Sequence, residues 1–355
     1  MSIAPASAAR VSIAQAQPSW SPSGVYLNTA SYGLPPESGW TALQDALADW
    51  RGGRTSWERW GDSTEGARAA FAAMVGVAPG SVAVGATVSG LVGLVAGSIP
   101  DGARVLVPEI EFTSTLFPFM VQQARGVTVR TVPAARLAEA IDERTDVVAF
   151  SAVQMSTGEV ADLDAIVAAA RAHGALTVLD ATQACGWLPL DASRFDFVAC
   201  AAYKWLMSPR GTAFMTVAPE RLPGVVPAAA GWYAGEDVHA SYFGPPLRLA
   251  RDARRLDTSP AWFSWVGALP ALELVNRIGV EAIHAHDVAL ANRFRAGRGL
   301  PPGDSAIVSL DAPEGAQRLE AAGIRAAVRG GRLRTSWHVY NTEGDVDAAL
   351  EALSG

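Results

Sequence analysis

Residues 177–204 constrain the fold of this chain more than any other stretch of its sequence. Residues 177–179 form a short β-branched and apolar run after a helix-like segment, which predicts a buried parallel strand ending at Asp180. Open α/β sheets bind ligands at the carboxyl ends of their strands, so we expect Asp180 to lie at a ligand site. The apolar run at 195–201 predicts a second strand, and Lys204 follows it closely.

A carboxylate and a lysine, each placed at a strand end, form the pair that a pyridoxal phosphate enzyme requires. The lysine forms the Schiff base with the cofactor, and the acid pairs with the pyridinium nitrogen so that the ring acts as an electron sink. We therefore predict that pyridoxal 5′-phosphate is the cofactor and that Lys204 and Asp180 are catalytic.

The same stretch carries a resemblance to a known family. The ordered motifs are SAVQMSTGEV, HGALTVLDATQACGWLPLD, FDFVACAAYKW and GTAFMTV. Together they resemble the class V aminotransferase and cysteine desulfurase family, and the pattern extends from residues 26–33 to residues 333–347. The resemblance implies an α/β fold of the fold type I pyridoxal phosphate enzymes, with a large, mostly parallel mixed-sheet domain and a smaller α+β C-terminal domain.

Threading the chain onto this pattern predicts three parts. Residues 1–22 form an N-terminal arm, residues 23–265 a large cofactor-binding domain, and residues 266–355 a connecting helix with the small domain. Within the last part, residues 268–289 read as one helix.

Composition and charge restrict the classes of function. The formal net charge is −7, and this excess of acidic residues argues against binding of nucleic acid or anionic membranes. Cys185 and Cys200 are the only cysteines and lie in apolar runs, so we interpret them as buried small hydrophobes and predict no disulfide framework. His284 and His286 are expected on the surface and not at a metal site. Without a recognisable signal peptide or an apolar stretch of about 20 residues, the expected location is cytoplasmic.

Residues 81–96 read as a strand, a turn of small residues and the start of a helix. Backbone N–H groups at such a turn, with the positive end of the helix, form an anion cradle. Ala86, Thr87 and Val88 are therefore candidates for binding the cofactor phosphate. The alternative is that Thr87 merely caps its own helix, and the place of the turn in the family pattern favours the cradle.

The resemblance also implies which residues contact the cofactor ring. Phe112 matches the aromatic or imidazole residue that stacks on the ring in the family, where many relatives carry histidine. Stacking contributes about 0.5–1.5 kcal/mol beyond burial and needs no proton chemistry. Gln183 matches the family donor to the phenolic oxygen, because its spacing from Asp180 agrees with the family pattern. Met155 stands where relatives often have asparagine, a departure from that pattern.

Two family phosphate contacts are altered just before the lysine. Relatives often carry serine and histidine where this chain has Ala201 and Tyr203, and only the tyrosine hydroxyl can still donate to a phosphate. In the family, a turn of the partner subunit commonly adds a threonine or serine. The corresponding turn here is residues 258–260, so the resemblance implies Ser259 as a phosphate contact and a homodimer with the active site at the subunit interface.

The substrate is expected to be a small-molecule amino acid derivative whose carboxylate is held by an arginine. Arg334 matches the family arginine that grips the substrate carboxylate, and a planar guanidinium can pair with both oxygens of that group. The alternative is a surface arginine on an edge strand. Arg329 also lies near a family arginine, in a less well preserved pattern. The entry segment at 26–32 lines the substrate side of the family site, and its candidates are Asn28, Ala30 and Tyr32.

One branch of the family is disfavoured by a short loop. Cysteine desulfurases carry a sulfur-accepting cysteine in a loop that follows a motif like the VRGG at 328–331. In this chain the loop passes directly into the next strand and contains no cysteine. A persulfide relay is therefore not expected.

The whole pattern is most similar to the ergothioneine lyases, the hercynylcysteine S-oxide lyases of ergothioneine biosynthesis. These enzymes cleave the C–S bond of a cysteine S-conjugate sulfoxide by β-elimination and release a sulfenate, pyruvate and ammonia. Such a substrate carries a trimethylammonium group, which aromatic faces attract by about 0.5–2 kcal/mol each. A recognition surface is expected among Tyr26, Tyr32, Trp57, Trp60, Trp232 and Tyr233, with core packing as the alternative for most of them.

Two other readings stay open. An aminotransferase or epimerase of the same fold would use the same cofactor residues. The alternative outside the enzymes is a catalytically inert relative that acts as a scaffold. The presence of Asp180, Gln183, Lys204 and Arg334 argues against it.

Overall fold

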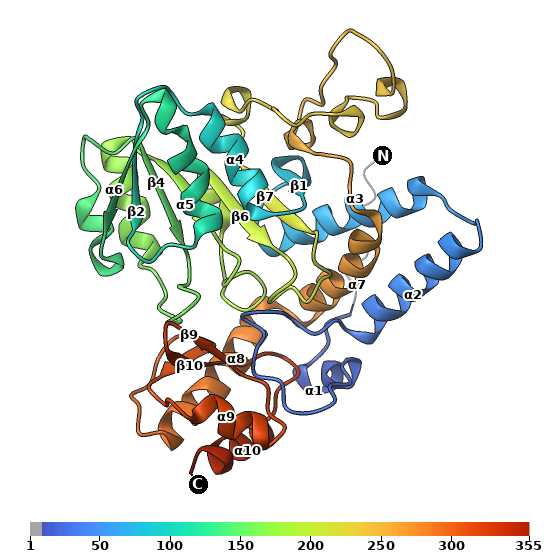
Figure 1. The fold of residues 1–355 in the computed structure, drawn as a ribbon. Helices are drawn as coiled ribbons and strands as arrows, with labels where there is room; N and C mark the ends of the chain where they lie inside the picture. Colours follow the sequence, from blue (N-terminus) through green and yellow to red (C-terminus); the bar gives the residue numbers. More distant parts are fainter. Residues whose placement is uncertain (1–8, 355) are drawn as a thin grey trace.

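A seven-stranded sheet forms the centre of the large domain (Figure 1). The computed structural model describes residues 9–354, so the start of the predicted arm, residues 1–8, lies outside the described residues. The sheet order is β1-β7-β6-β5-β4-β2-β3. The strands are β1 (Val82–Gly85), β2 (Arg104–Pro108), β3 (Thr128–Val132), β4 (Val147–Ser151), β5 (Leu176–Asp180), β6 (Phe197–Ala201) and β7 (Ala213–Val217).

The sheet is mixed but mostly parallel, as the sequence predicts. Strands β2 to β6 pair in parallel, while β7 runs antiparallel to both of its neighbours, β6 and β1. Because β7 reverses the direction twice, β1 points the same way as β5 and β6. The carboxyl ends of these three strands therefore meet at one edge of the sheet, which is where the fold places ligands.

Helices cover both faces of the sheet, which explains why strands such as β6 read as unbroken apolar runs. On one face, α4 and α5 contribute Leu91 and Phe119 to a buried cluster. On the other face, α3, α6 and α7 contribute Phe71, Ile166 and Trp265. The large-domain helices are α2 (Glu37–Arg51), α3 (Trp57–Met74), α4 (Val88–Ser98), α5 (Thr113–Met120), α6 (Leu163–His173) and α7 (Trp262–Ile278).

The C-terminal part folds on its own three-stranded antiparallel sheet, in the order β8-β10-β9. Its elements are α8 (Val280–Gly297), β8 (Ile307–Leu310), α9 (Gly315–Ala321), β9 (Ala327–Arg329), β10 (Arg332–Ser336) and α10 (Glu343–Ser354). Gly330 and Gly331 alone join β9 to β10, and both have positive φ, as a two-residue hairpin turn requires. The turn is thus too tight to present a cysteine loop.

The chain near the N-terminus packs against this small domain. The short helix α1 (Ile13–Ala16) precedes a segment in which Tyr26 bridges Arg325 and Asn28 bridges Ser336. The predicted large domain, residues 23–265, therefore begins with residues that pair with the small sheet. The domain boundaries themselves stay a prediction.

The single helix predicted over residues 268–289 is wrong. The structure has two helices there, because α7 ends at Ile278 and α8 starts at Val280. Gly279 between them has a φ of 91°, which a right-handed helix does not accommodate.

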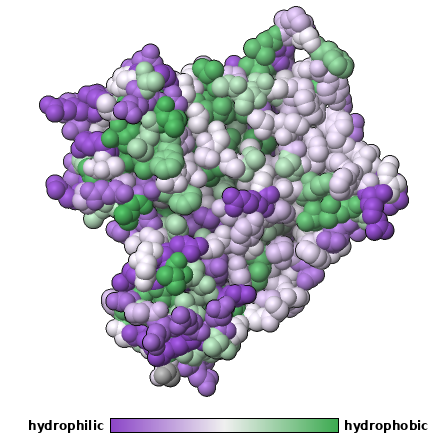
Figure 2. Space-filling model, in the orientation of Figure 1, coloured by the Kyte–Doolittle hydropathy of each residue, from purple (hydrophilic) through white to green (hydrophobic). Residues whose placement is uncertain are grey.

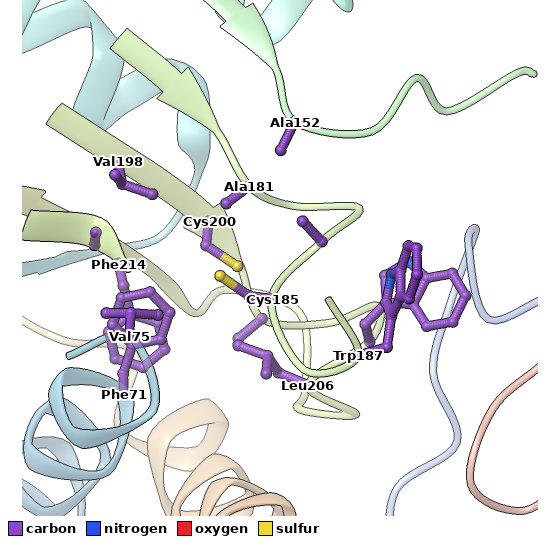
Figure 3. Packing of buried hydrophobic residues seen from close by; sticks show 14 of the residues in the cluster. Phe71, Val75, Ala152, Ala181, Cys185, Trp187, Val198, Cys200, Leu206 and Phe214 are labelled. Atoms are coloured by element: carbon purple, nitrogen blue, oxygen red, sulfur yellow. The ribbon is translucent and has the colours of Figure 1, made fainter. Parts of the chain in front are cut away.

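Both cysteines are free and buried, which confirms their interpretation as small core residues. Figure 3 shows their sulfur atoms facing each other in a cluster with Phe71, Phe214 and Leu206. Burial raises the pKa of the Cys200 thiol well above its ordinary value. A thiol kept protonated in this way is a poor nucleophile.

The two domains present different surfaces. In the view of Figure 2, hydrophobic patches are scattered over the large domain, whereas the small domain is mostly hydrophilic. Among the helices of the described residues, none has the length and hydropathy needed to cross a membrane.

A buried ion pair ties α3 to the edge of the sheet. Arg68 contacts Asp257 at 2.6 Å, and both side chains are almost fully buried. Arg68 also donates to the carbonyl of Val82, while Asp257 accepts from the amide of Val84 at 2.8 Å. The pair therefore fixes β1 and the start of the 258–260 turn in one place.

We predict that Arg68→Ala lowers the free energy of unfolding by about 3–5 kcal/mol, because it leaves the Asp257 carboxylate buried without its partner. Urea unfolding followed by circular dichroism measures the loss. Arg318→Ala, which removes an exposed ion pair on α9, is the matched control and is expected to change stability far less. Equal losses in the two variants would contradict the role of the buried pair.

Candidate active site

A cavity opens at the sheet edge where β4, β5 and β6 end. It brings together every predicted cofactor residue except Ser259, and those lining it are Ala86, Thr87, Val88, Phe112, Asp180, Gln183, Tyr203 and Lys204. These residues come from four separate segments of the chain. Their convergence follows from the common direction of β1, β5 and β6.

Lys204 is the only lysine among the 355 residues. It follows β6, is only 6% exposed, and its Nζ lies 5.4 Å from the centroid of the Phe112 ring. Burial, reinforced by Arg334 and Arg329, lowers its pKa to about 8, although Asp180 acts in the opposite direction. About a tenth of the lysine side chains therefore carry a neutral, nucleophilic amine at pH 7, far more than for a lysine with its ordinary pKa.

Asp180 ends β5 and is held by two donors. The Thr115 hydroxyl donates to its Oδ2 at 3.0 Å, and the Thr182 amide donates to its Oδ1 at 2.9 Å. These two hydrogen bonds fix the orientation of the carboxyl group. Sequence reasoning missed Thr115 because this residue lies on α5, 65 positions before Asp180.

The predicted anion cradle has the expected local structure. Strand β1 ends at Gly85, α4 starts at Val88, and the Thr87 hydroxyl accepts from the amide of Gly90 at 3.1 Å. Thr87 is thus the helix cap, and its position at the positive end of α4 also suits an anion. The two readings of Thr87 from the sequence are compatible.

Arg210 also lines the cavity, and sequence reasoning missed it. Its guanidinium carbon lies 5.0 Å from the centroid of the Tyr203 ring, a cation–π contact that orients it. No ion pair to Arg210 occurs within the described part of the chain. The sequence signal that could have identified Arg210 is its position, six residues after the sole lysine.

Gln183 keeps part of its amide available for a ligand. Its Nε2 donates to the carbonyl of Ala30 at 3.0 Å, and its Oε1 accepts from the indole of Trp205 at 2.7 Å. One of the two Nε2 hydrogens remains for another acceptor. Met155 lines the cavity as predicted, while Gln154 turns away and donates to the carbonyl of Ile110.

A second acidic residue, Glu111, holds the backbone of Phe112, the residue predicted to stack on the cofactor ring. It accepts from the amides of Phe112 and Ser151, both at 2.7 Å. Burial, with a smaller contribution from Asp180, raises the pKa of Glu111 to about 7. Glu111 therefore anchors the Phe112 backbone to the end of β4, a role that the sequence did not indicate.

The predicted substrate residues gather around Arg334. Its Nη2 donates to the Ser31 hydroxyl at 2.6 Å and to Asn28 Oδ1 at 3.4 Å. Tyr32 lies beside the cavity, with its ring 5.0 Å from that of Tyr203. Ala30 is buried and acts through its backbone, because its carbonyl accepts from Gln183. Arg334 is 1% exposed, so it is not the surface arginine of the alternative reading.

Some predicted residues lie elsewhere. Ser259 is exposed and does not line the cavity of its own chain. Most of the predicted aromatic surface is also placed elsewhere: Trp57 packs on Trp232 at 5.0 Å and Trp232 on Tyr233 at 5.4 Å. Trp60 packs on Phe263 and Tyr26 on Tyr340, so only Tyr32 has a ring contact to a cavity residue.

The expectation of surface histidines is also wrong in part. His284 and His286 are half-buried, and His284 stacks on Trp187 with 5.8 Å between ring centroids. Trp187 of the large domain covers His284, and His286 bonds to the carbonyl of Asn341, which follows β10. Among the described residues, no group of histidine, cysteine or acidic side chains has metal-binding geometry.

These groups match the chemistry of pyridoxal phosphate. A buried amine suits the cofactor aldehyde, a fixed carboxylate suits its pyridinium nitrogen, and the α4 N-terminus with Arg210 suits its phosphate. Phe112 offers a ring face next to the amine. The fold and the cavity together define a fold type I enzyme that depends on pyridoxal phosphate.

The chain belongs to the class V aminotransferase family, whose sequence pattern matches residues 42–297. It is 28% identical to the uncharacterized aminotransferase YcbU of Bacillus subtilis, over 84% of this chain and 85% of that protein. It is 30% identical to isopenicillin N epimerase of Streptomyces clavuligerus, over 81% and 84%. The solved structure of the cystine C-S lyase C-DES shares the fold, with a TM-score of 0.84, 22% identity and coverage of 94% and 97%.

The lowered pKa of Lys204 predicts how its reactivity depends on pH. In the cofactor-free protein, we expect the rate of acylation at Lys204 to rise with a midpoint near pH 8, where an exposed lysine would show a midpoint near 10.5. The reason is that only the neutral amine reacts, and burial favours the neutral form. Mass spectrometry of the labelled peptide measures the rate without interference, since no other lysine is present.

A midpoint above pH 10 would show that the amine is not desolvated. Asp180→Asn serves as the control, because removing the carboxylate that raises the pKa of Lys204 is expected to move the midpoint to lower pH.

Proposed function

We propose that the protein is a pyridoxal phosphate-dependent carbon–sulfur lyase that acts on a cysteine S-conjugate by β-elimination. The proposed substrate is hercynylcysteine sulfoxide, which gives the sulfenate that is reduced to ergothioneine, with pyruvate and ammonia. One observation carries the proposal. A complete lysine and aspartate site lies in a chain whose Gly330–Gly331 turn leaves no place for a sulfur-accepting cysteine.

The residues of the cavity suit proton removal from an amino acid. Pyridoxal phosphate, when bound, supplies an electron sink for negative charge at the substrate Cα. The Lys204 amine, with its pKa near 8, can take up a proton close to neutral pH. Asp180 is fixed at the end of β5 by Thr115 and Thr182, where its carboxyl group can pair with the pyridinium nitrogen of the cofactor. Arg334, which belongs to the small domain, orients the substrate carboxylate.

Loss of a group from Cβ distinguishes a lyase from the rival readings. Transfer of sulfur requires a reactive thiol, whereas Cys185 and Cys200 are buried in the core. An aminotransferase or an epimerase would use the same Lys204, and relatives named for both activities cover more than 80% of the chain. The similarity of the sequence pattern to the ergothioneine lyases favours elimination. An inert scaffold is disfavoured because the buried lysine and its acid are both retained.

The proposal includes a homodimer in the cytoplasm. Ser259 is exposed at the end of a turn that Asp257 anchors, and it does not reach its own cavity. A second copy could use this serine at its phosphate site, as the family resemblance implies.

The first test mixes the purified holoenzyme with hercynylcysteine sulfoxide and a thiol reductant. We expect pyruvate and ergothioneine in equal amounts, measured by a coupled pyruvate assay and by mass spectrometry. Lys204→Ala is expected to abolish turnover, and Asp180→Ala to lose most of it. Ammonia retained on a product, or inversion at Cα without pyruvate, would instead identify an aminotransferase or an epimerase.

We further predict that Arg210→Ala weakens cofactor binding by about 10- to 100-fold, because a charge-assisted hydrogen bond contributes about 1.5–3 kcal/mol. Arg210 would supply the phosphate contact that Ala201 cannot. Equilibrium dialysis of pyridoxal phosphate against the dialysed apo-protein measures the dissociation constant independently of activity. Arg210→Lys is expected to recover part of the loss. Unchanged binding in Arg210→Ala would exclude this role.

A further inference from the structure

Two arginines of the small domain converge on one hydroxyl group at the substrate side. Arg334 Nη2 donates to Ser31 Oγ at 2.6 Å, and Arg329 Nη2 donates to the same oxygen at 3.0 Å. We propose that Arg329 binds a second anionic group of the substrate, so that the enzyme takes amino acids whose side chain carries its own acidic group. This inference rests on the proposed function and names its substrate class.

No protein carboxylate neutralises these two cations. Within residues 9–354, neither arginine has an acidic oxygen within 4.0 Å, unlike Arg104, Arg221 and Arg318, each of which is paired with aspartate or glutamate. Burial, together with the charge of Arg329, lowers the pKa of Arg334 to about 10. A charge cluster of this kind is costly unless a ligand supplies the counter-charge.

The two arginines lie at different depths. Arg334 is 1% exposed, and its Nη atoms are already engaged by Met155, Asn28 and Ser31. Its Nε is buried and has no hydrogen-bond partner in the described structure. Arg334, the deeper of the two arginines, is assigned to the carboxylate next to the reacting carbon.

Arg329 is the more accessible of the pair. It is half-buried at the end of β9, and its only bond to another side chain is the one to Ser31. The tight Gly330–Gly331 turn holds it at a fixed distance from β10, which carries Arg334. Because the deeper arginine suffices for one carboxylate, the outer arginine can pair with a group farther along the substrate.

Arg332 provides a matched control on the same hairpin. It is exposed, and its guanidinium bonds to Ser309 of β8 and not to Ser31. Replacing it alters the charge of the small domain by the same amount as replacing Arg329.

The test compares how tightly the holoenzyme binds two ligands, L-2-aminoadipate and the side-chain amide of L-2-aminoadipate. Titration of the cofactor absorbance measures both dissociation constants. Neither compound has a leaving group on Cβ, so affinity is measured without elimination. We expect the wild-type enzyme to bind the diacid at least about 10-fold more tightly than the amide, as a charge-assisted pair requires. Arg329→Gln should abolish this preference, while Arg332→Gln should keep it and Arg329→Lys should keep part of it.

Two results would overturn the inference. One is a wild-type enzyme that does not prefer the diacid. The other is an equal loss for both ligands in Arg329→Gln, which would show that both arginines bind the carboxylate next to the reacting carbon. Either result leaves the lyase proposal intact, because that proposal depends on pyruvate release and not on this preference.

Discussion

The active site depends on holding a lysine amine out of water beside a carboxylate. Lys204 and Asp180 both lie at the edge of the sheet where parallel strands end, and helices on both faces exclude solvent from this edge. Burial lowers the pKa of Lys204, and the nearby Asp180 offsets only part of that effect. The fold thus leaves a reactive amine beside a carboxyl group whose position Thr115 and Thr182 fix.

The small domain acts on this site from the opposite side. Its arginines lower the pKa of Lys204 further, so the reactivity of the lysine depends on residues more than 120 positions away. The hydrogen bonds of Ser31, Asn28 and Ala30 connect the two domains through the entry segment. Cofactor chemistry and substrate selection are therefore coupled through one short stretch of backbone.

Much of the fold and the centre of the site were readable in the sequence. Asp180, Lys204 and the turn at Thr87 each follow a recognisable strand, so periodicity and motif order located them. Thr115, Glu111 and Arg210 could not be found in this way, because each acts through a contact between segments that only the tertiary fold brings together. The break at Gly279 was missed because apolar periodicity continues on both sides of it.

The pairing of Asn28 with Ser336 has a consequence for the synthesis of the protein. A chain emerging from the ribosome can build the seven-stranded sheet long before β10 exists, since domains fold as units and the N-terminal one folds first. The entry segment must then wait until β10 has been made before it finds its partner strand. A nascent chain that lacks β10 would therefore hold the lysine pocket without the arginines of the small domain beside it.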